Sequence, residues 1–155
     1  MRTKKIFICL LLTTYCLLLL GCALPRIIVL DDPLSPEEHL NLGVTYEKNG
    51  ELDNALKEYK TASKKLPLAY LYTGNIYLKK GELDEAESYY KKAIRKDPKI
   101  ADAYNNLAWL YYLKGDRLDE AEHLVIKAIE LNTSKKDIYL DTLKKIRELN
   151  NNKIE

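Results

Sequence analysis

Histidine, cysteine and carboxylate side chains are the groups of this chain that could do chemistry, and their spacing argues against a catalytic site. The two histidines, His39 and His123, are far apart; His39 falls at a packing position and His123 on an exposed helix flank. No cysteine is spaced to join either in a metal site. Acidic pairs such as Glu82 and Asp84 lie where a helix begins, where carboxylates suit the positive end of the helix dipole. We therefore expect no enzyme activity, no metal and no cofactor.

Cys22 is the one side chain whose surroundings predict a covalent reaction. A short basic leader precedes an apolar run of 15 residues at positions 6–20, which is shorter than the ~20 residues of a membrane-spanning helix. The run ends in the box LLGC, which resembles a bacterial lipoprotein signal. The resemblance implies diacylglyceryl transfer to the Cys22 thiol, cleavage after Gly21 and acylation of the new amine by a fatty acid such as palmitate. An uncleaved anchor helix and an ordinary export signal are the alternatives.

The predicted mature chain would lose residues 1–21 and keep one thiol. Cys9 and Cys16 lie in the discarded segment, so no internal disulfide could form. Two or three acyl chains would hold the protein permanently at a membrane. By resemblance to enterobacterial sorting, Ala23 after the cysteine favours the outer membrane of the cell envelope, on its periplasmic face.

The charge of the mature chain is close to neutral. Of 25 basic residues, three lie in the leader, so 22 remain against 23 acidic residues. With no basic face visible in the sequence, nucleic acid is not an expected partner.

Residues 22–35 are predicted to be a tether that carries the lipidated cysteine. Its apolar stretch Ile27–Leu30 is unusual because flexible linkers are usually polar. The stretch could pack on the first repeat and cover its open end. Alternatively, it could occupy a binding groove or pair with another subunit.

The rest of the chain is organised around a repeated unit, clearest in residues 67–98. Apolar and small residues recur at helical spacing on both sides of Lys80-Gly81, which predicts a helix, a tight turn and a second helix. Gly81 lies where the chain must reverse in a left-handed conformation. The word GELDNA at Gly50 returns as GELDEA at Gly81 and as GDRLDEA at Gly115. A period of this size indicates stacked helical hairpins.

Three copies of this unit resemble the tetratricopeptide repeat. The first copy matches the family pattern at His39, Leu42, Gly43, Tyr46, Ala55, Tyr59, Ala62 and Pro67; the second at Tyr70, Thr73, Gly74, Tyr77, Ala86, Tyr90, Ala93 and Pro98; the third at Tyr104, Leu107, Ala108, Tyr111, Ala121, Val125 and Ala128. The resemblance implies an all-α solenoid of three helical hairpins, followed by a C-terminal capping helix. The expected repeats are 36–66, 67–98 and 99–133, with the cap at 134–150 and a frayed tail at 151–155.

Several local features are expected to depart from the family pattern. His39 and Thr73 replace apolar residues, and an extra residue near Arg117 should distort the third turn.

Helices are predicted at 36–48, 52–65, 68–80, 83–96, 100–114 and 117–131. In the cap, Ser134 and Asp137 resemble a capping box, and the buried stripe is predicted to be Ile138, Thr142, Leu143, Ile146 and Leu149.

The candidate site is a surface. In this family the first helices of successive repeats line a concave groove, and the resemblance places ten residues in it: Asn41, Val44, Leu71, Tyr72, Asn75, Leu78, Asn105, Asn106, Trp109 and Tyr112. Asparagine amides can pair with a peptide main chain. The lysines that clamp a terminal carboxylate in one branch of the family are absent, because Leu71 holds that slot. Alternatively, these are common consensus residues, with Trp109 partly covered by the cap helix, and a partner could bind a convex or edge surface.

We therefore predict a membrane-anchored scaffold or assembly factor that binds a protein or peptide partner in the bacterial cell envelope. The alternative is a self-associating structural lipoprotein whose exposed repeat ends pair with each other.

Overall fold

The computed structural model describes residues 32–152, so the predicted signal, Cys22, the stretch Ile27–Leu30 and the last three residues lie outside the described part. The described residues form helices and turns and contain no strand, which confirms the all-α prediction. The helices are α2 (Pro36–Lys48), α3 (Leu52–Ala62), α4 (Leu68–Lys79), α5 (Leu83–Lys96), α6 (Ala101–Lys114), α7 (Leu118–Leu131) and α8 (Lys136–Asn151), with a 3-10 turn η1 (Thr133–Lys135) before the last. No helix in this part is long and apolar enough to cross a bilayer.

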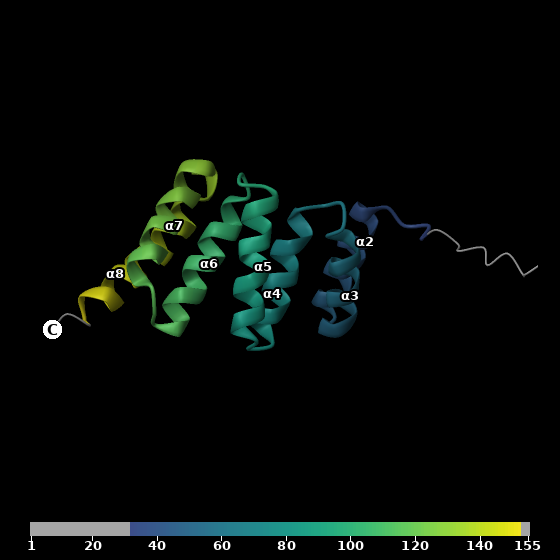
Figure 1. Ribbon diagram of the computed structural model, residues 1–155, viewed down its shortest axis with the longest axis horizontal. Helices are drawn as coiled ribbons and strands as arrows, with labels where there is room; N and C mark the ends of the chain where they lie inside the picture. Colours follow the sequence, from purple (N-terminus) through teal and green to yellow (C-terminus); the bar gives the residue numbers. More distant parts are fainter. Residues whose placement is uncertain (1–31, 153–155) are drawn as a thin grey trace, which may run out of the picture. The chain divides into compact units, whose positions relative to one another are not determined.

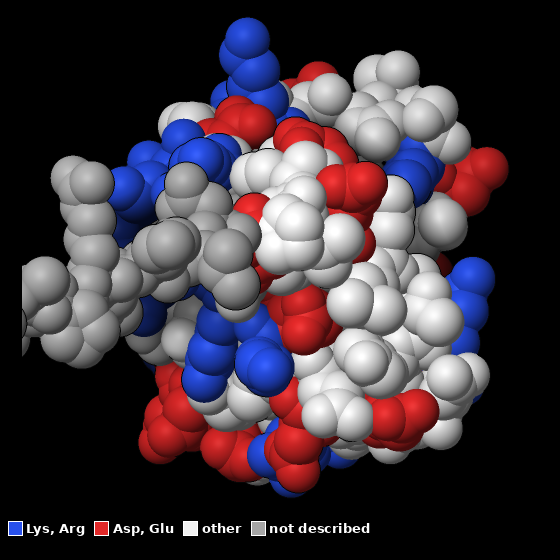
Figure 2. Space-filling model, turned by 90° about the vertical axis from the view of Figure 1, so that its right-hand side faces the viewer, with Lys and Arg blue, Asp and Glu red and all other residues white. Residues whose placement is uncertain are grey.

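The helices pack in chain order as hairpins (Figure 1). The pairs α2–α3, α4–α5 and α6–α7 each form one hairpin, and neighbouring hairpins meet through α3 with α4 and α5 with α6. The last helix, α8, lies against α6 and α7. At the opposite end of the array, on the side of α2 and α3, Figure 2 shows a band of uncharged residues between acidic and basic side chains.

The turn glycines have the predicted backbone. Gly50, Gly81 and Gly115 have φ of 79°, 78° and 64°, the left-handed region that costs glycine little. The third turn is distorted as predicted, because its extra residue is taken up by Arg117, whose φ is 48°. This is a conformation that residues with a side chain seldom adopt.

The core of each hairpin depends on a match in size between the side chains that face each other from its two helices. In the first two hairpins a glycine of the first helix faces a fully buried tyrosine of the second: Gly43 faces Tyr59, and Gly74 faces Tyr90. A Cβ built on Gly74 would lie 2.6 Å from Tyr90 Cδ1, well inside van der Waals contact. The third hairpin has the buried residues Ala108 and Val125 at the corresponding positions.

The polar residues at the apolar positions of the pattern are both buried and hydrogen-bonded. His39 is 6% exposed, and its Nδ1 lies 2.6 Å from Glu58 Oε2. Thr73 is fully buried and donates from Oγ1 to the main-chain oxygen of Ala69 at 2.8 Å. Each of the two side chains thus has a polar partner that offsets part of the cost of its burial.

Two helix predictions were wrong in detail. α3 ends at Ala62, three residues before the predicted end, because residues 63–65 form the turn that leads into Pro67. The predicted capping box is also absent: no side chain caps α8 at Lys135, and Asn132 instead accepts from the Ser134 N–H at the start of η1.

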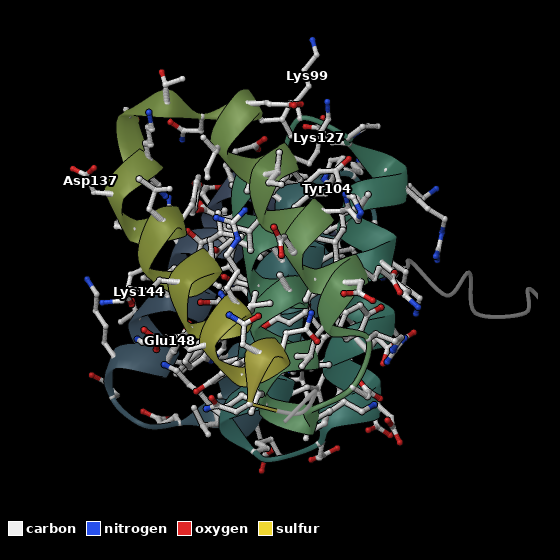
Figure 3. The ribbon with its side chains drawn as sticks, turned by 90° about the vertical axis from the view of Figure 1, so that its left-hand side faces the viewer. Lys99, Tyr104, Lys127, Asp137, Lys144 and Glu148 are labelled. Carbon is white, nitrogen blue, oxygen red and sulfur yellow. The ribbon has the colours of Figure 1, made fainter. Side chains whose placement is uncertain are left out.

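The 3-10 turn also changes which residues of α8 are buried. Ile138, predicted to be in the buried stripe, is 62% exposed, whereas Tyr139 is 1% exposed and donates from its hydroxyl to Asp102 Oδ1 at 2.8 Å. The predictions of Thr142, Leu143 and Ile146 as buried residues are confirmed. Figure 3 views this end, where Asp137 and Lys144 of α8 point away from the other helices.

Candidate functional site

The ten predicted groove residues lie on the first helices of the three hairpins, α2, α4 and α6. Leu71 and Asn105 are almost fully buried, at 4% and 8% exposed. Asn41 is exposed, and the other seven are half-buried: Val44, Tyr72, Asn75, Leu78, Asn106, Trp109 and Tyr112. The half-buried members and Asn41 are therefore the accessible part of the set.

Three asparagines from two hairpins form a row of carboxamides. Asn106 Nδ2 donates to Asn75 Oδ1 at 2.9 Å, and the Tyr90 hydroxyl donates to the same oxygen at 3.0 Å. Asn105 Nδ2 donates to Asn106 Oδ1 at the long distance of 3.5 Å. Asn105 Oδ1 is buried and accepts no hydrogen bond from the described residues. A buried acceptor without a donor is costly, so the carboxamides that a ligand could reach are those of the half-buried Asn75 and Asn106.

Aromatic side chains flank the asparagine row. The rings of Trp109 and Tyr112 stack with centroids 4.8 Å apart, and the Lys145 ammonium of α8 lies 5.3 Å from the Trp109 ring centroid. The ring centroid of Tyr72 lies 5.2 Å from that of Tyr59 in α3. Trp109 is thus half-buried with a cap-helix side chain beside it, as the consensus-residue alternative expected.

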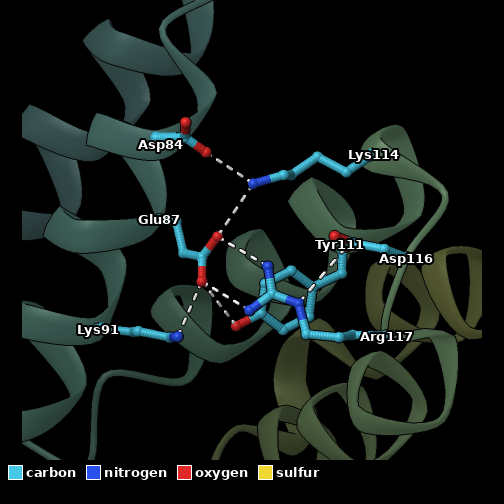
Figure 4. A network of polar contacts seen from close by, with 7 residues as sticks. All are labelled: Asp84, Glu87, Lys91, Tyr111, Lys114, Asp116 and Arg117. Atoms are coloured by element: carbon cyan, nitrogen blue, oxygen red, sulfur yellow. Dashed lines mark hydrogen bonds and ion pairs between the residues drawn. The ribbon is translucent and has the colours of Figure 1, made fainter.

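A second polar cluster, not predicted from the sequence, surrounds Glu87 of α5 (Figure 4). Arg117 donates through both terminal nitrogens to the two carboxylate oxygens at 2.7 and 2.8 Å. Lys91 at 2.8 Å, Lys114 at 3.2 Å and the Tyr111 hydroxyl at 3.4 Å also donate to this carboxylate. The Arg117 guanidinium lies 3.8 Å from the Tyr111 ring centroid. The extra residue in the third turn is the one sequence signal that could have indicated this cluster.

The cluster stabilises the ionised form of Glu87. The hydrogen bonds from Arg117 are the main cause that lowers its pKa, with Lys91 and Lys114 adding to them and partial burial opposing them. Lys114 of α6 and Arg117 at the start of α7 pair with Glu87 of α5, so the second and third hairpins are held together by charge as well as by packing.

Replacing Glu87 by Gln should lower the free energy of unfolding near neutral pH by about 1–3 kcal/mol, because the cations lose their shared carboxylate. A group with a lowered folded-state pKa stabilises the fold above its unfolded-state pKa, near 4.5 for Glu87, and this contribution is lost as pH falls towards the folded-state value. Urea denaturation at about pH 5 and about pH 3 should therefore show a larger acid loss for the wild type than for Glu87→Gln. The exposed Glu85 on the same helix is the control; an acid loss in Glu87→Gln equal to that of wild type and Glu85→Gln would contradict this role.

Among residues 32–152, no group of three His, Cys, Asp or Glu side chains could hold a metal ion. His123 is exposed and His39 is engaged with Glu58.

Comparisons with known proteins agree with the repeat pattern. A family model described as tetratricopeptide repeat matches residues 40–99 and 73–134. No curated protein matches the sequence.

Solved structures share the fold. The TPR2B domain in the pHsp70 complex of yeast Sti1 is 22% identical, with 73% of this chain and 96% of that one covered and a TM-score of 0.68. The first TPR of Spaghetti (RPAP3), bound to the HSP90 peptide SRMEEVD, is 20% identical over 76% and 94% of the two chains, with a TM-score of 0.67. The Yersinia enterocolitica type III secretion chaperone SycD, in complex with a peptide of the translocator YopD, is 20% identical over 76% and 93%, with a TM-score of 0.66.

Proposed function

The chain belongs to the tetratricopeptide repeat family, and from this premise we propose that it is a protein-interaction scaffold anchored by lipid in the bacterial cell envelope. It binds a peptide or protein partner through the face formed by α2, α4 and α6. It acts there as an adaptor or assembly factor.

The carboxamide row is the observation that carries the binding proposal. Asn75 and Asn106 are half-buried and present carboxamide groups at the surface, and such groups can pair with both the N–H and the C=O of an extended peptide. The hydrogen bonds from Asn106 and Tyr90 to Asn75 hold the row in place before a ligand arrives. The neighbouring Trp109 and Tyr112 add amphipathic contact area of the kind that dominates binding energy in protein interfaces.

Structural relatives support the same kind of partner. Those described above include a domain in a complex with pHsp70, a domain with an HSP90 peptide and a chaperone with a translocator peptide. This chain differs at Leu71, which holds the slot of a carboxylate-clamping lysine in one branch of the family and is 4% exposed. We therefore expect recognition of main chain and apolar side chains, without a requirement for a free C-terminus.

The lipid anchor rests on the sequence. The basic leader, the apolar run at 6–20 and the LLGC box support acylation of Cys22. Ala23 supports the outer membrane, with the repeat domain on the periplasmic side. The short connection from Cys22 to the start of α2 at Pro36 would keep the domain within ~50 Å of the bilayer, even if fully extended.

Photocrosslinking in cells tests the binding face. A photoreactive amino acid is placed at Asn41, Tyr72 or Tyr112, and the adducts are identified by mass spectrometry. The expected result is one envelope protein captured from all three positions, because they lie along the first helices of successive hairpins.

The control position is Lys144, whose side chain is 75% exposed on α8. Lys145 is unsuitable because its ammonium lies against Trp109. Capture of the same protein with equal yield from Lys144, or adducts only between copies of the chain, would overturn the proposed binding face.

A further inference from the structure

Two equivalent junctions between hairpins differ in their charge. In the first seam, formed by α3, α4 and α5, Lys60 lies 5.2 Å from the Tyr77 ring centroid. In the second seam, formed by α5, α6 and α7, Lys91 lies 6.0 Å from the Tyr111 ring centroid. The two lysines occupy the same place in the repeat, as do the two tyrosines. The seams therefore serve as internal controls for each other.

Asp53 pairs with Lys80 in the first seam as Asp84 pairs with Lys114 in the second, but only the second seam has a carboxylate at the position of Glu87. Glu87 accepts from Lys91, Lys114 and Arg117 there (Figure 4). The corresponding residue of the first seam is Leu56, which, like Glu87, follows its turn glycine by the same interval. Leu56 cannot accept a hydrogen bond and packs on the core.

The first seam instead presents cations on aromatic rings. Lys60 Nζ donates to the Tyr77 hydroxyl at 2.8 Å, and this hydrogen bond raises the pKa of Lys60. Tyr77 stacks on Tyr89 with centroids 5.2 Å apart, and Lys92 Nζ lies 4.3 Å from the Tyr89 ring centroid. Within residues 32–152 neither ammonium forms an ion pair within 4 Å, although the more distant charge of Glu82 also favours the charged form of Lys60.

The helix dipole accounts for only part of this arrangement. Arg95 and Lys96 lie in the last turn of α5, where cations favour the carbonyl end of a helix. Lys60 likewise lies in the last turn of α3, whereas Lys92 lies before the last turn of α5, and the ammonium groups of both lie over tyrosine rings. Lys57 is exposed one turn before Lys60 on α3, and Lys64 is exposed in the turn that follows this helix. Positive charge therefore extends along the seam.

We propose that the first seam binds a carboxylate of an acidic protein segment beside Lys60 and Lys92, outside the position that Leu56 fills. Lys60 and Lys92 provide the charge-assisted hydrogen bonds, and Tyr77 and Tyr89 form the surface beneath them. This site is separate from the asparagine row of α4 and α6, so a partner could occupy both or either one.

The test uses the full-length chain in a nonionic detergent and a fluorescently labelled oligoglutamate peptide at low ionic strength, with binding followed by anisotropy. The double variant Lys60→Gln/Lys92→Gln should weaken binding by about tenfold or more, because it removes both charge-assisted contacts. The control Lys127→Gln/Lys144→Gln removes the same charge from α7 and α8 and should change affinity by less than about twofold.

A second variant supplies the carboxylate from within the chain. Leu56→Glu should block oligoglutamate binding, because its side chain would reach Lys60 as Glu87 reaches Lys91. Thermal unfolding shows whether each variant is folded. If Leu56→Glu does not fold, the test rests on Lys60→Gln/Lys92→Gln alone.

Three outcomes would overturn the proposal. The seam and control variants could lose affinity equally, or the wild type could fail to bind oligoglutamate. A seam-dependent preference for an oligonucleotide or for anionic lipid vesicles over oligoglutamate would assign the seam to a different polyanion.

Discussion

Replacing Gly74 by Ala should lower the free energy of unfolding by about 1–3 kcal/mol, the usual effect of overpacking a core. The new Cβ would lie 2.6 Å from both Cδ1 and Cε1 of Tyr90, a fully buried ring. The sign is diagnostic, because the same change inside an exposed helix stabilises it by about 1 kcal/mol. Urea denaturation of the two chains measures the difference.

The third hairpin supplies the design of the control. Ala108 and Val125 occupy the places of Gly74 and Tyr90 there, and both are fully buried. The double variant Gly74→Ala/Tyr90→Val reproduces that pairing, so it should be less destabilised than the two single changes added together. Strict additivity, or a more stable Gly74→Ala, would show that the glycine is not required by the tyrosine.

Replacing Cys22 by Ser should abolish acylation of the chain. A serine hydroxyl lacks the thiol to which the diacylglyceryl group is transferred in the lipoprotein pathway that the LLGC box resembles. Labelled palmitate fed to cells should enter the wild type and not the variant. The wild type should also have the intact mass of a chain that begins at acylated Cys22.

The other two cysteines are matched controls for this prediction. Cys9 and Cys16 lie in the segment that the proposed cleavage after Gly21 would remove, so Cys9→Ser and Cys16→Ser should keep the label. Membrane fractionation alone would not decide the matter, because an uncleaved precursor retains the apolar run at 6–20. Label retained in Cys22→Ser would contradict the anchor.

The sequence predicted the features that depend on local backbone and on repetition. The helices of the three hairpins and the left-handed turn glycines follow from periodicity and from the conformational freedom of glycine. The repeat pattern also placed Tyr59, Tyr90 and Tyr111 in the core, where all three are fully buried. Because three repeats show the same pattern, each one supports the interpretation of the other two.

The predictions failed where contacts depend on exact register. Ile138 and Tyr139 are both plausible members of an apolar stripe, and only the 3-10 turn that starts the cap decides that Tyr139 is buried. The Glu87 cluster joins residues from three helices, and the position of Lys145 over Trp109 depends on how α8 crosses α6. Contacts between side chains of different helices are set by tertiary packing, which helical spacing alone does not encode.

The two seams are held by different interactions, so which of them is the stronger depends on the salt in solution. The joint around Glu87 gains from attraction between opposite charges, which dissolved ions screen. The junction around Tyr77 and Tyr89 has ion pairs of its own, Lys79–Glu47 and Lys80–Asp53, and it also gains from ring stacking and burial, which sulfate and similar salts strengthen. Under a pulling force, the hairpin that detaches first can therefore be changed by the choice and concentration of salt, with no change in sequence.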